Sequence, residues 1–301
     1  MNLKTNKRVV MKIKNGLGII GGSGIYDIGG LENPRWIKVE SSFGEPSDEL
    51  LFGKFNDREV VFLPRHGRGH KIPPSDINYL ANIEILKKVG VKKIISFGAV
   101  GSFKEELSPG TFVIIDQFFD RTINRRKSFF GPGLAAHVQF SHPICSRMQE
   151  VLIQASKKNK LKVVENGTYL AMEGPQFSTL AESKMYKNWG LDVIGMTNMP
   201  EAKLAREAEI CYATVAMVTD YDCWHPNHET VSVSEIIKVL TENSMNAKNL
   251  LKSTIPLLSA QDEDNDCDCN TALENAIITA PDSRDPEMLE KLKYIAGRVL
   301  K

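Results

Sequence analysis

Three short loops rich in small residues each follow an apolar segment, and each could bind an anion through its backbone N–H groups. They comprise residues 21–24 (GGSG), 64–67 (PRHG) and 97–102 (FGAVGS). Glycine lets backbone donors approach an anion, Ser23 adds a hydroxyl, and the guanidinium of Arg65 can direct two N–H groups at two oxygens. Because α/β sheets bind ligands at the carboxyl ends of their strands, the three loops together predict a site for an oxyanion such as phosphate.

Two other interpretations of these loops are disfavoured. A dinucleotide fingerprint counted from Gly22 places Asp27 where the third glycine belongs, which argues against NAD. The spacing of His66 and His70 invites a zinc site, but the glycines between them break any helix that would align the two rings. For the first loop alone, a tight turn without a ligand explains the residues as well as phosphate binding does.

Two carboxylates follow another apolar segment and are suited to acid–base chemistry or to recognition of a purine edge. Asp220 and Asp222 come directly after residues 212–219, and side chains at i and i+2 lie on the same side of an extended chain. The charge of one carboxylate can raise the pKa of the other. The alternative is that Asp220 forms a turn or caps a helix.

The segment 172–178 (MEGPQFS) combines a carboxylate with an aromatic ring. Glu173 could hold sugar hydroxyls, and Phe177 could stack on a planar ring. A structural turn with a half-buried aromatic explains the same residues, and for this segment taken alone we favour the turn.

The composition is that of an ordinary globular protein. The chain has 301 residues, 42% of them hydrophobic, and a formal net charge of +1, which argues against a nucleic-acid backbone or an anionic membrane as its main partner. No apolar run approaches the 18 or so residues of a membrane span, and the basic N-terminus lacks the apolar core of a secretory signal. Five cysteines, an odd number, do not form a disulfide framework, so we expect a cytoplasmic protein with reduced thiols.

Apolar and amphipathic stretches alternate along the chain, which predicts a single α/β domain with a twisted mixed sheet flanked by helices. We expect a basic N-terminal extension over 1–15, a main domain over 16–258, and a tail over 259–301 with an acidic loop and a charged helix at about 286–300. The predicted strands cover 17–22, 59–67, 92–101, 111–116, 191–196 and 212–220. The predicted helices cover 78–89, 144–159, 178–188, 198–208 and 231–252.

Six motifs occur together and in order along the chain: IIGGSG, PRHG, AVGS, EGPQFS, GMTNMPEA (195–202) and TDYDCW. In this combination the sequence resembles the S-methyl-5′-thioadenosine phosphorylases of the trimeric purine nucleoside phosphorylase family over roughly residues 17–258. The resemblance implies a trimer or a dimer of trimers. It also implies phosphorolysis of a nucleoside with inorganic phosphate as co-substrate and with no metal or organic cofactor.

The resemblance also assigns site residues, with catalytic roles for Asp220, Ser178 and Thr197. The implied phosphate site comprises Ser23, Arg65, His66, Ala99 (through its backbone N–H) and Thr197. The implied nucleoside site comprises Met196 and Phe177 at the ribose, and Ser178, Asp220 and Asp222 at the base. The implied pocket for the 5′-methylthio group comprises Val233, Ile236 and Ile237, with His137 reaching in from a neighbouring subunit.

The chemistry of phosphorolysis explains why residues of these types are expected in the site. Cleavage of the bond between C1′ and N9 builds positive charge on the sugar, which an attacking phosphate stabilises, and negative charge on the base. A protonated Asp220 that donates to N7 would make adenine a better leaving group, and the nearby charge of Asp222 would favour that protonation.

Three positions depart from the family pattern or stand out within it. Gly98 replaces a serine or threonine whose hydroxyl touches phosphate in relatives, and Gln176 replaces an arginine, which puts a local ion pair in doubt. The Cys267-x-Cys269 pair resembles one that some heat-adapted relatives oxidise to a disulfide, whereas here we expect free surface thiols.

Two other functions compete with this interpretation. Phosphorylases of inosine and guanosine prefer Asn where this chain has Asp220, because a keto oxygen needs a donor while the 6-amino group of adenine needs an acceptor. A purine nucleoside phosphorylase that acts on adenosine is also an alternative. A non-catalytic nucleotide-binding protein on the same fold is disfavoured because Arg65, His66, Thr197 and Asp220 are all present.

Overall fold

The computed structural model describes residues 12–22, 25, 30–55, 58–226, 233–260 and 267–300. Its strands form one mixed sheet, and the predicted fold class is confirmed. The described strands are β1 (Gly16–Gly21), β2 (Glu32–Ile37), β3 (Leu50–Phe55), β4 (Arg58–Pro64), β5 (Val91–Ser102), β6 (Phe112–Ile114), β7 (Gln117–Asp120), β8 (Val163–Glu165), β9 (Thr168–Ala171), β10 (Val193–Gly195) and β11 (Cys211–Asp220).

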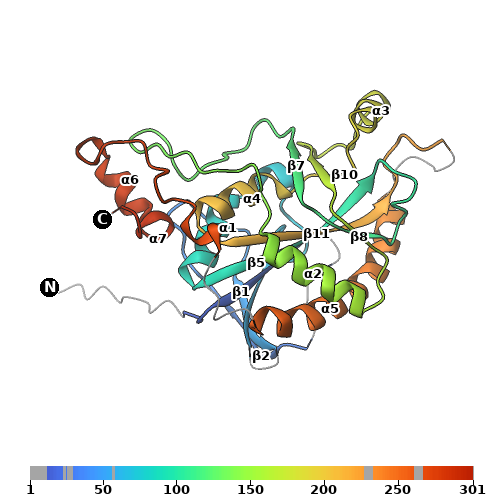
Figure 1. Ribbon diagram of the computed structural model, residues 1–301, viewed down its shortest axis with the longest axis horizontal. Coiled ribbons are helices and arrows are strands. Elements are labelled where there is room, and N and C mark those ends of the chain that lie inside the picture. The colour runs from blue at the N-terminus through green and yellow to red at the C-terminus, as the bar shows by residue number, and fades with distance from the viewer. Residues whose placement is uncertain are drawn as a thin grey trace.

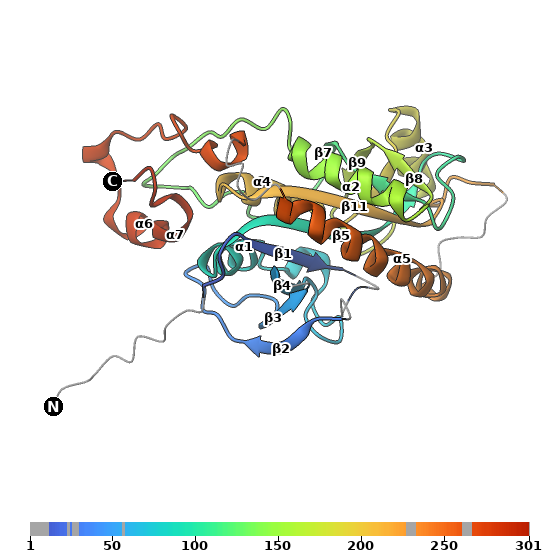
Figure 2. The same cartoon turned by 60° about the horizontal axis from the view of Figure 1, so that its bottom comes forward.

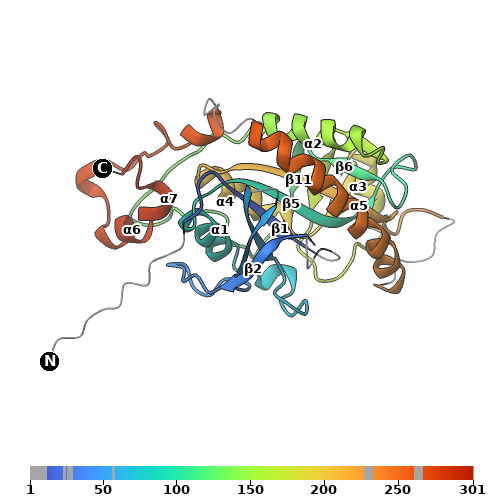
Figure 3. The ribbon, with the colours of Figure 1, turned by 90° about the horizontal axis from the view of Figure 1, so that it is seen from below.

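The main helices cover both faces of this sheet. They are α1 (Tyr79–Lys88), α2 (Ser146–Lys158), α3 (Leu180–Asn188), α4 (Asn198–Glu207), α5 (Val233–Ala260), α6 (Pro286–Lys291) and α7 (Lys293–Ala296). Helices α2 and α5 pack together on one face, and α1 and α4 pack together on the other, with β5 and β11 between the two pairs (Figures 1 and 3). Within the described residues, no helix is long and apolar enough to cross a membrane.

The sheet divides at β5, the longest of the strands. Its residues 93–101 pair in parallel with β11, and its last two, Gly101 and Ser102, pair antiparallel with β10. The path β2-β3-β4-β1 lies on one side of β5, and β10-β9-β7 continues from its carboxyl end. Figure 2 shows β1, β5 and β11 running side by side through the middle of the molecule. A fork of this kind opens space between the ends of neighbouring strands.

Local signals explain where several helices begin. Asn78 accepts a hydrogen bond from the backbone of Ala81 at the start of α1. At α3, Thr179 and Glu182 form a reciprocal capping box. Asp285 caps α6, and Pro286 occupies its first turn, where the missing N–H costs nothing.

The C-terminal part departs from the expected pattern in two places. Helix α5 continues to residue 260, past the predicted domain boundary at 258. The prediction of a single charged helix over 286–300 is wrong, because the chain turns at Leu292 and forms two short helices, α6 and α7. Leu292 is fully buried at this turn, and α7 then packs against α1. The acidic loop falls mainly on residues 261–266, outside the described part.

Candidate active site

A cavity of about 1000 Å³ lies at the fork of the sheet. Its walls come from the ends of β5, β10 and β11, from the loop after β4, and from one face of α5. The location agrees with the rule that α/β sheets bind ligands beyond the carboxyl ends of their strands. Of the residues implied by the sequence, ten line this cavity: Arg65, His66, Ala99, Phe177, Met196, Thr197, Asp220, Asp222, Ile236 and Ile237.

A β-bulge directs Asp220 into the cavity. The pairing of β11 with β5 runs in register to Val218 and Val100, and then shifts so that Asp220 lies opposite Gly101. The intervening Thr219 is the extra residue, and its hydroxyl oxygen lies 3.2 Å from the carbonyl oxygen of Val100. Bulges re-aim side chains in this way. A β-carbon on Gly101 would lie 2.9 Å from Oδ1 of Asp220, so a side chain at this position would displace the carboxylate.

Small residues bring the anion-binding loops close to one another. A β-carbon on Gly22 would lie 2.7 Å from Nη1 of Arg65 and 3.1 Å from the carbonyl oxygen of Phe97. The absence of a side chain at Gly22 therefore lets the first loop touch the second and third. Ser23, predicted to bind phosphate, lies outside the described residues.

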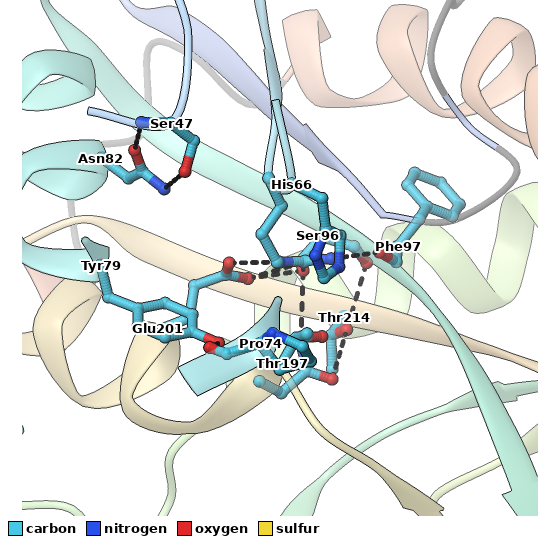
Figure 4. A network of polar contacts seen from close by, with 12 residues as sticks. Ser47, His66, Pro74, Tyr79, Asn82, Ser96, Phe97, Thr197, Glu201 and Thr214 are labelled. Atoms are coloured by element: carbon cyan, nitrogen blue, oxygen red, sulfur yellow. Dashed lines mark hydrogen bonds and ion pairs between the residues drawn. The ribbon is translucent and has the colours of Figure 1, made fainter. Parts of the chain in front are cut away.

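Arg65 lines the cavity and is fully buried in a polar network that includes Ser96, Phe97 and Glu201, which Figure 4 labels. Its Nε donates to Oε2 of Glu201 at 2.7 Å and its Nη2 to Oε1 at 3.0 Å. Nη2 also donates to the hydroxyl of Ser96 at 2.5 Å, and Nη1 donates to the carbonyl of Phe97 at 3.0 Å. Although burial disfavours its charge, Glu201 raises the pKa of Arg65 above the ordinary value.

This network changes the role expected for Arg65. The sequence suggested that its guanidinium directs two donors at a bound anion, but the bidentate ion pair is formed with the carboxylate of Glu201. Four of its five N–H groups point at protein acceptors, so only one, on Nη1, is left for a ligand. Arg65 therefore supplies positive charge at the floor of the cavity and joins β4, β5 and α4.

His66 lines the cavity beside Arg65 as a neutral ring. Burial and the charge of Arg65 lower the pKa of His66 to about 3. Its Nδ1 lies 2.8 Å from the carbonyl oxygen of Ile72, which can only accept, so Nδ1 carries the proton. Nε2 is then an acceptor until an anion beside the ring favours the imidazolium.

This lowered pKa predicts a dependence of stability on pH. An unfolded histidine takes up a proton near pH 6.5, whereas folded His66 does not until about pH 3, so the free energy of unfolding falls as the pH is lowered between these values. The slope from this group approaches about 1.4 kcal/mol per pH unit. Denaturant unfolding without phosphate between pH 7 and pH 5 should show a shallower slope for His66→Gln than for the parent protein.

The control for this measurement is His142→Gln, because His142 is exposed. That variant should keep the parental slope. Equal slopes for His66→Gln and the parent protein would contradict a neutral, buried His66.

The two carboxylates at the end of β11 have different surroundings. Both oxygens of Asp220 accept hydrogen bonds, from the hydroxyl of Thr219 at 2.7 Å and from the backbone N–H of Asp222 at 2.8 Å. The second bond closes an Asx turn, so the turn that the sequence offered as an alternative role for Asp220 does form. Asp220 also lines the cavity, so both roles occur at the same residue.

Asp222 is the more deeply buried of the pair. Its side chain is 5% exposed, and burial raises its pKa, opposed by the hydroxyls of Ser183 and Ser178. Oδ2 of Asp222 makes no hydrogen bond of ordinary length with the described residues. A buried carboxyl group with a raised pKa in the wall of a cavity suits a group that shares a proton with a ligand.

An apolar face of α5 closes the other end of the cavity. It contributes residues one helical turn apart, among them Ile236, Ile237, Leu240 and Thr241. The sequence left open whether this face is simply core. Ile237 is 57% exposed within the cavity wall and Ile236 is half-buried, which favours a binding surface over a core position. The side chain of Val233 lies outside the described residues.

The remaining predicted residues lie at or beyond the edge of the cavity. Ser178 does not line it, but its hydroxyl lies close enough to Asp222 to lower that pKa. His137 is exposed in the loop before α2 and does not contribute to the cavity of its own chain. Gln176 is also exposed.

Glu173 holds protein loops, and the turn interpretation of its segment is the one the contacts favour. Its carboxylate accepts from the hydroxyl of Ser75 at 2.5 Å, from the backbone of Ile123 and from Nε of Arg125 at 3.2 Å. It does not line the cavity, so contact with sugar hydroxyls is not supported.

Sequence reasoning missed a second buried arginine that shapes the site. Arg125 donates to the carbonyl oxygens of Met196, Met199 and Glu173, so it fixes the two loops that carry Met196 and Phe177. Glu201, Ser96 and Tyr212 were also missed. Glu201 lies within the GMTNMPEA motif, and a carboxylate there is the one signal that could have suggested a partner for a buried arginine.

Comparisons with known proteins agree with this arrangement. A sequence model of the phosphorylase superfamily matches residues 17–256. A Cereibacter sphaeroides protein named S-methyl-5′-thioadenosine phosphorylase is 54% identical over 289 residues, covering 96% of this chain and 100% of that protein. A Rhodospirillum rubrum protein of the same name is 56% identical, covering 94% of this chain and 97% of that protein.

Solved structures show the same fold. A methylthioadenosine phosphorylase from an antarctic soil metagenomic library superposes with a TM-score of 0.89 at 44% identity, covering 94% of this chain and 99% of that chain. The Schistosoma mansoni enzyme in complex with adenine gives a TM-score of 0.82 at 37% identity, covering 86% of this chain and 97% of that chain. This chain therefore belongs to the phosphorylase superfamily, within the family of S-methyl-5′-thioadenosine phosphorylases.

Proposed function

We propose that this chain catalyses the phosphorolysis of S-methyl-5′-thioadenosine to adenine and 5-methylthioribose 1-phosphate, a step of purine and methionine salvage. The observation that carries the proposal is the cavity itself. It combines anion-binding groups at Arg65, His66 and Thr197, two carboxylates at Asp220 and Asp222, and an apolar face of α5 in one space. Each part matches one portion of the two substrates.

The reaction requires attack, departure and one proton transfer. A phosphate oxygen bonds to C1′ of the sugar while the bond to N9 breaks and its electron pair moves onto adenine. The negative phosphate stabilises the cationic sugar from one side. A proton delivered to N7 from the pair of Asp220 and Asp222 neutralises the leaving base, an effect typically worth ~10²–10⁴-fold.

The other residues position the two substrates. Phosphate lies among Ser23, the backbone N–H of Ala99, the hydroxyl of Thr197, and the charges of Arg65 and His66. The ribose lies against Met196 and Phe177, and the base lies near Ser178. The 5′-methylthio group packs on Ile236 and Ile237 with Val233. No metal or organic cofactor enters the scheme, because phosphate itself is the nucleophile.

We propose that the protein works in the cytoplasm as a homo-oligomer, either a trimer or a dimer of trimers. In the part of the chain that the structure describes, exposed apolar side chains gather on β7 and α3. Phe119 and Trp189 are 41% and 48% exposed and their rings lie 5.4 Å apart, while Leu180 and Met185 are exposed on the same helix. His137, which is also exposed, would reach the cavity of a neighbouring subunit. Light scattering coupled to size exclusion measures the assembly directly.

The test of the function is a spectrophotometric screen with three nucleosides. Methylthioadenosine, adenosine and inosine are each incubated with and without phosphate, and release of the base is followed. Phosphate-dependent release of adenine, fastest from methylthioadenosine, is the expected result. A preference for inosine would favour the 6-oxopurine alternative, and no release with any substrate would favour a binding protein.

Gly98 offers a test of the phosphate site. A β-carbon there would meet only Oγ1 of Thr197, at 3.8 Å, so a serine fits without strain. Gly98→Ser adds a hydroxyl donor to the loop and should lower the KM for phosphate by about tenfold, the effect of one hydrogen bond to a charged group. Initial rates at varied phosphate concentration give this value.

The matched control is Gly98→Ala, which adds the same β-carbon without the hydroxyl and should leave the KM near the parental value. An unchanged or higher KM for Gly98→Ser would show that phosphate does not reach this loop.

Ile237 tests the 5′ end of the cavity. Ile237→Asp places a charge on the apolar face of α5, which should weaken methylthioadenosine binding far more than adenosine binding, because adenosine carries a polar hydroxyl at that position. The ratio of kcat/KM for the two nucleosides should fall by more than about tenfold.

A control for general damage is Met245→Asp, because Met245 is 64% exposed on the same helix and does not line the cavity. An equal loss of kcat/KM for both nucleosides would indicate that Ile237 has only a structural role. Misfolding of Ile237→Asp but not of the control would indicate the same.

A further inference from the structure

Four of the five cysteines meet in one cluster although they come from three distant parts of the chain. Cys145 is the residue before α2, Cys211 begins β11, and Cys267 and Cys269 lie at the start of the C-terminal segment. All are free thiols, and their sulfur atoms lie within 4.8 Å of one another. The sequence suggested free surface thiols for the Cys267-x-Cys269 pair. In the structure Cys267 is half-buried and Cys269 is buried, so the pair is not an exposed surface pair.

The spacing of the sulfur atoms matches a tetrahedral metal centre. The Sγ of Cys267 lies 3.7 Å from that of Cys145 and 3.6 Å from that of Cys211. With zinc–sulfur bonds of about 2.3 Å, neighbouring sulfurs around a tetrahedral ion are about 3.8 Å apart. A mononuclear ion therefore fits this cluster with small adjustments of the side chains.

The surroundings suit a buried, negatively charged centre. Cys145, Cys211 and Cys269 are 3%, 5% and 4% exposed. The sulfur of Cys145 belongs to the residue at the N-terminal end of α2, where the helix dipole favours negative charge.

We propose that Cys145, Cys211, Cys267 and Cys269 bind one zinc ion as four thiolates. Binding releases the four thiol protons and forms four zinc–sulfur bonds, with no oxidation or reduction. Thiolates select soft or borderline cations, so Zn²⁺ is the ion of choice over Mg²⁺ or Ca²⁺. Four protein ligands leave no open position, which makes the site structural.

The position of the cluster agrees with a structural role. None of the four cysteines lines the cavity, and Cys211 and Asp220 stand at opposite ends of β11. The ion joins the C-terminal segment to α2 and to the central sheet. Leu273, which follows the Cys-x-Cys turn, is 1% exposed in the core, and α7 farther along packs against α1. The zinc site thus adds a four-ligand anchor to a segment that is also held by its packing and by hydrogen bonds such as that from the backbone N–H of Leu273 to Glu209.

The test measures metal in the full-length protein purified in reducing buffer without chelators. We expect about one zinc per chain by inductively coupled plasma mass spectrometry. Cys145→Ser and Cys269→Ser should each lose at least about 90% of this metal, because three ligands do not make a closed site. Cys223→Ser is the matched control, since Cys223 lies outside the cluster, and it should retain the parental zinc content.

Cobalt provides a second readout that does not depend on activity or folding yield. Exchange of the purified protein into Co²⁺ should give the intense visible ligand-field bands of a tetrahedral thiolate complex, absent from Cys269→Ser. Two results overturn the proposal. One is a metal-free protein that takes up neither Zn²⁺ nor Co²⁺ after full reduction. The other is the finding that all four cysteines form disulfides when thiols are titrated in denaturant on protein purified without a reducing agent.

Discussion

Asp220→Asn should reduce kcat/KM for methylthioadenosine by at least about 100-fold and raise the relative rate on inosine. An asparagine cannot hand a proton to N7, but its amide can donate to the keto oxygen of a 6-oxopurine. The structure makes this variant a clean test. The Asx turn needs only an acceptor oxygen for the backbone N–H of Asp222, and asparagine retains one. The turn should therefore survive while the chemistry is lost.

The control for this result is Asp116→Asn. Asp116 also follows a strand and accepts a backbone hydrogen bond, from Gly167 at 2.9 Å, but it lies outside the cavity. Asp116→Asn should leave the nucleoside preference unchanged. If Asp220→Asn melts at a lower temperature yet keeps the parental preference, the assignment of the base site to Asp220 is wrong.

Glu201→Gln should destabilise the protein by roughly 3–5 kcal/mol, because it leaves a buried arginine without its counter-charge. The carboxylate of Glu201 accepts four hydrogen bonds, two from Arg65 and one each from Ser96 and Tyr212. An amide group of the same size places N–H groups against some of these donors. We also expect the KM for phosphate to rise, because the reoriented Arg65 no longer supports the floor of the cavity.

The comparison for this effect is Glu165→Gln. The ion pair of Glu165 with Lys157 is 2.6 Å long but exposed on both sides, so its loss should change stability by less than about 1 kcal/mol. The double variant Arg65→Met with Glu201→Leu should recover part of the stability while remaining unable to bind phosphate tightly. A Glu201→Gln protein as stable as the parent would show that the network contributes little to folding.

Much of the fold follows from the sequence because its central strands carry clear signals. Segments such as 92–101 and 212–220 are mostly apolar, as expected for strands largely buried on both faces, and they form β5 and β11. The edge strands gave no such signal. Strand β2 reads ENPRWI, with a proline and four exposed residues, and only its pairing with β3 makes it a strand.

Another part of the sheet could not be predicted because local sequence does not decide strand partners. Asn166 and Gly167 separate β8 from β9 and are typical of a two-residue hairpin turn. The two strands nevertheless pair with different neighbours, β8 with β6 and β9 with β7 and β10. The long-range packing of the sheet overrides the local preference.

The candidate site shows the same division between local and long-range information. Glycine-rich loops and paired carboxylates at strand ends could be read from the chain, and the cavity brings most of them together. The side-chain contacts that support these loops and carboxylates could not be predicted from the sequence. Arg65 and Glu201 are 136 positions apart, and only the tertiary structure shows that the guanidinium binds a carboxylate more fully than a ligand. The same reason hid the role of Arg125.

The buried network also constrains how this sequence can evolve. Arg65, Ser96, Glu201 and Tyr212 are interlocked, so a single replacement leaves a donor or a charge without its partner inside the protein. If single changes at these positions destabilise the fold as expected for Glu201→Gln, a chain that carries one of them is removed before a compensating change arises. The four positions therefore behave as one heritable character, kept or lost together. A lineage can change its nucleoside preference stepwise at the cavity wall, but it cannot abandon the floor of the cavity by small steps.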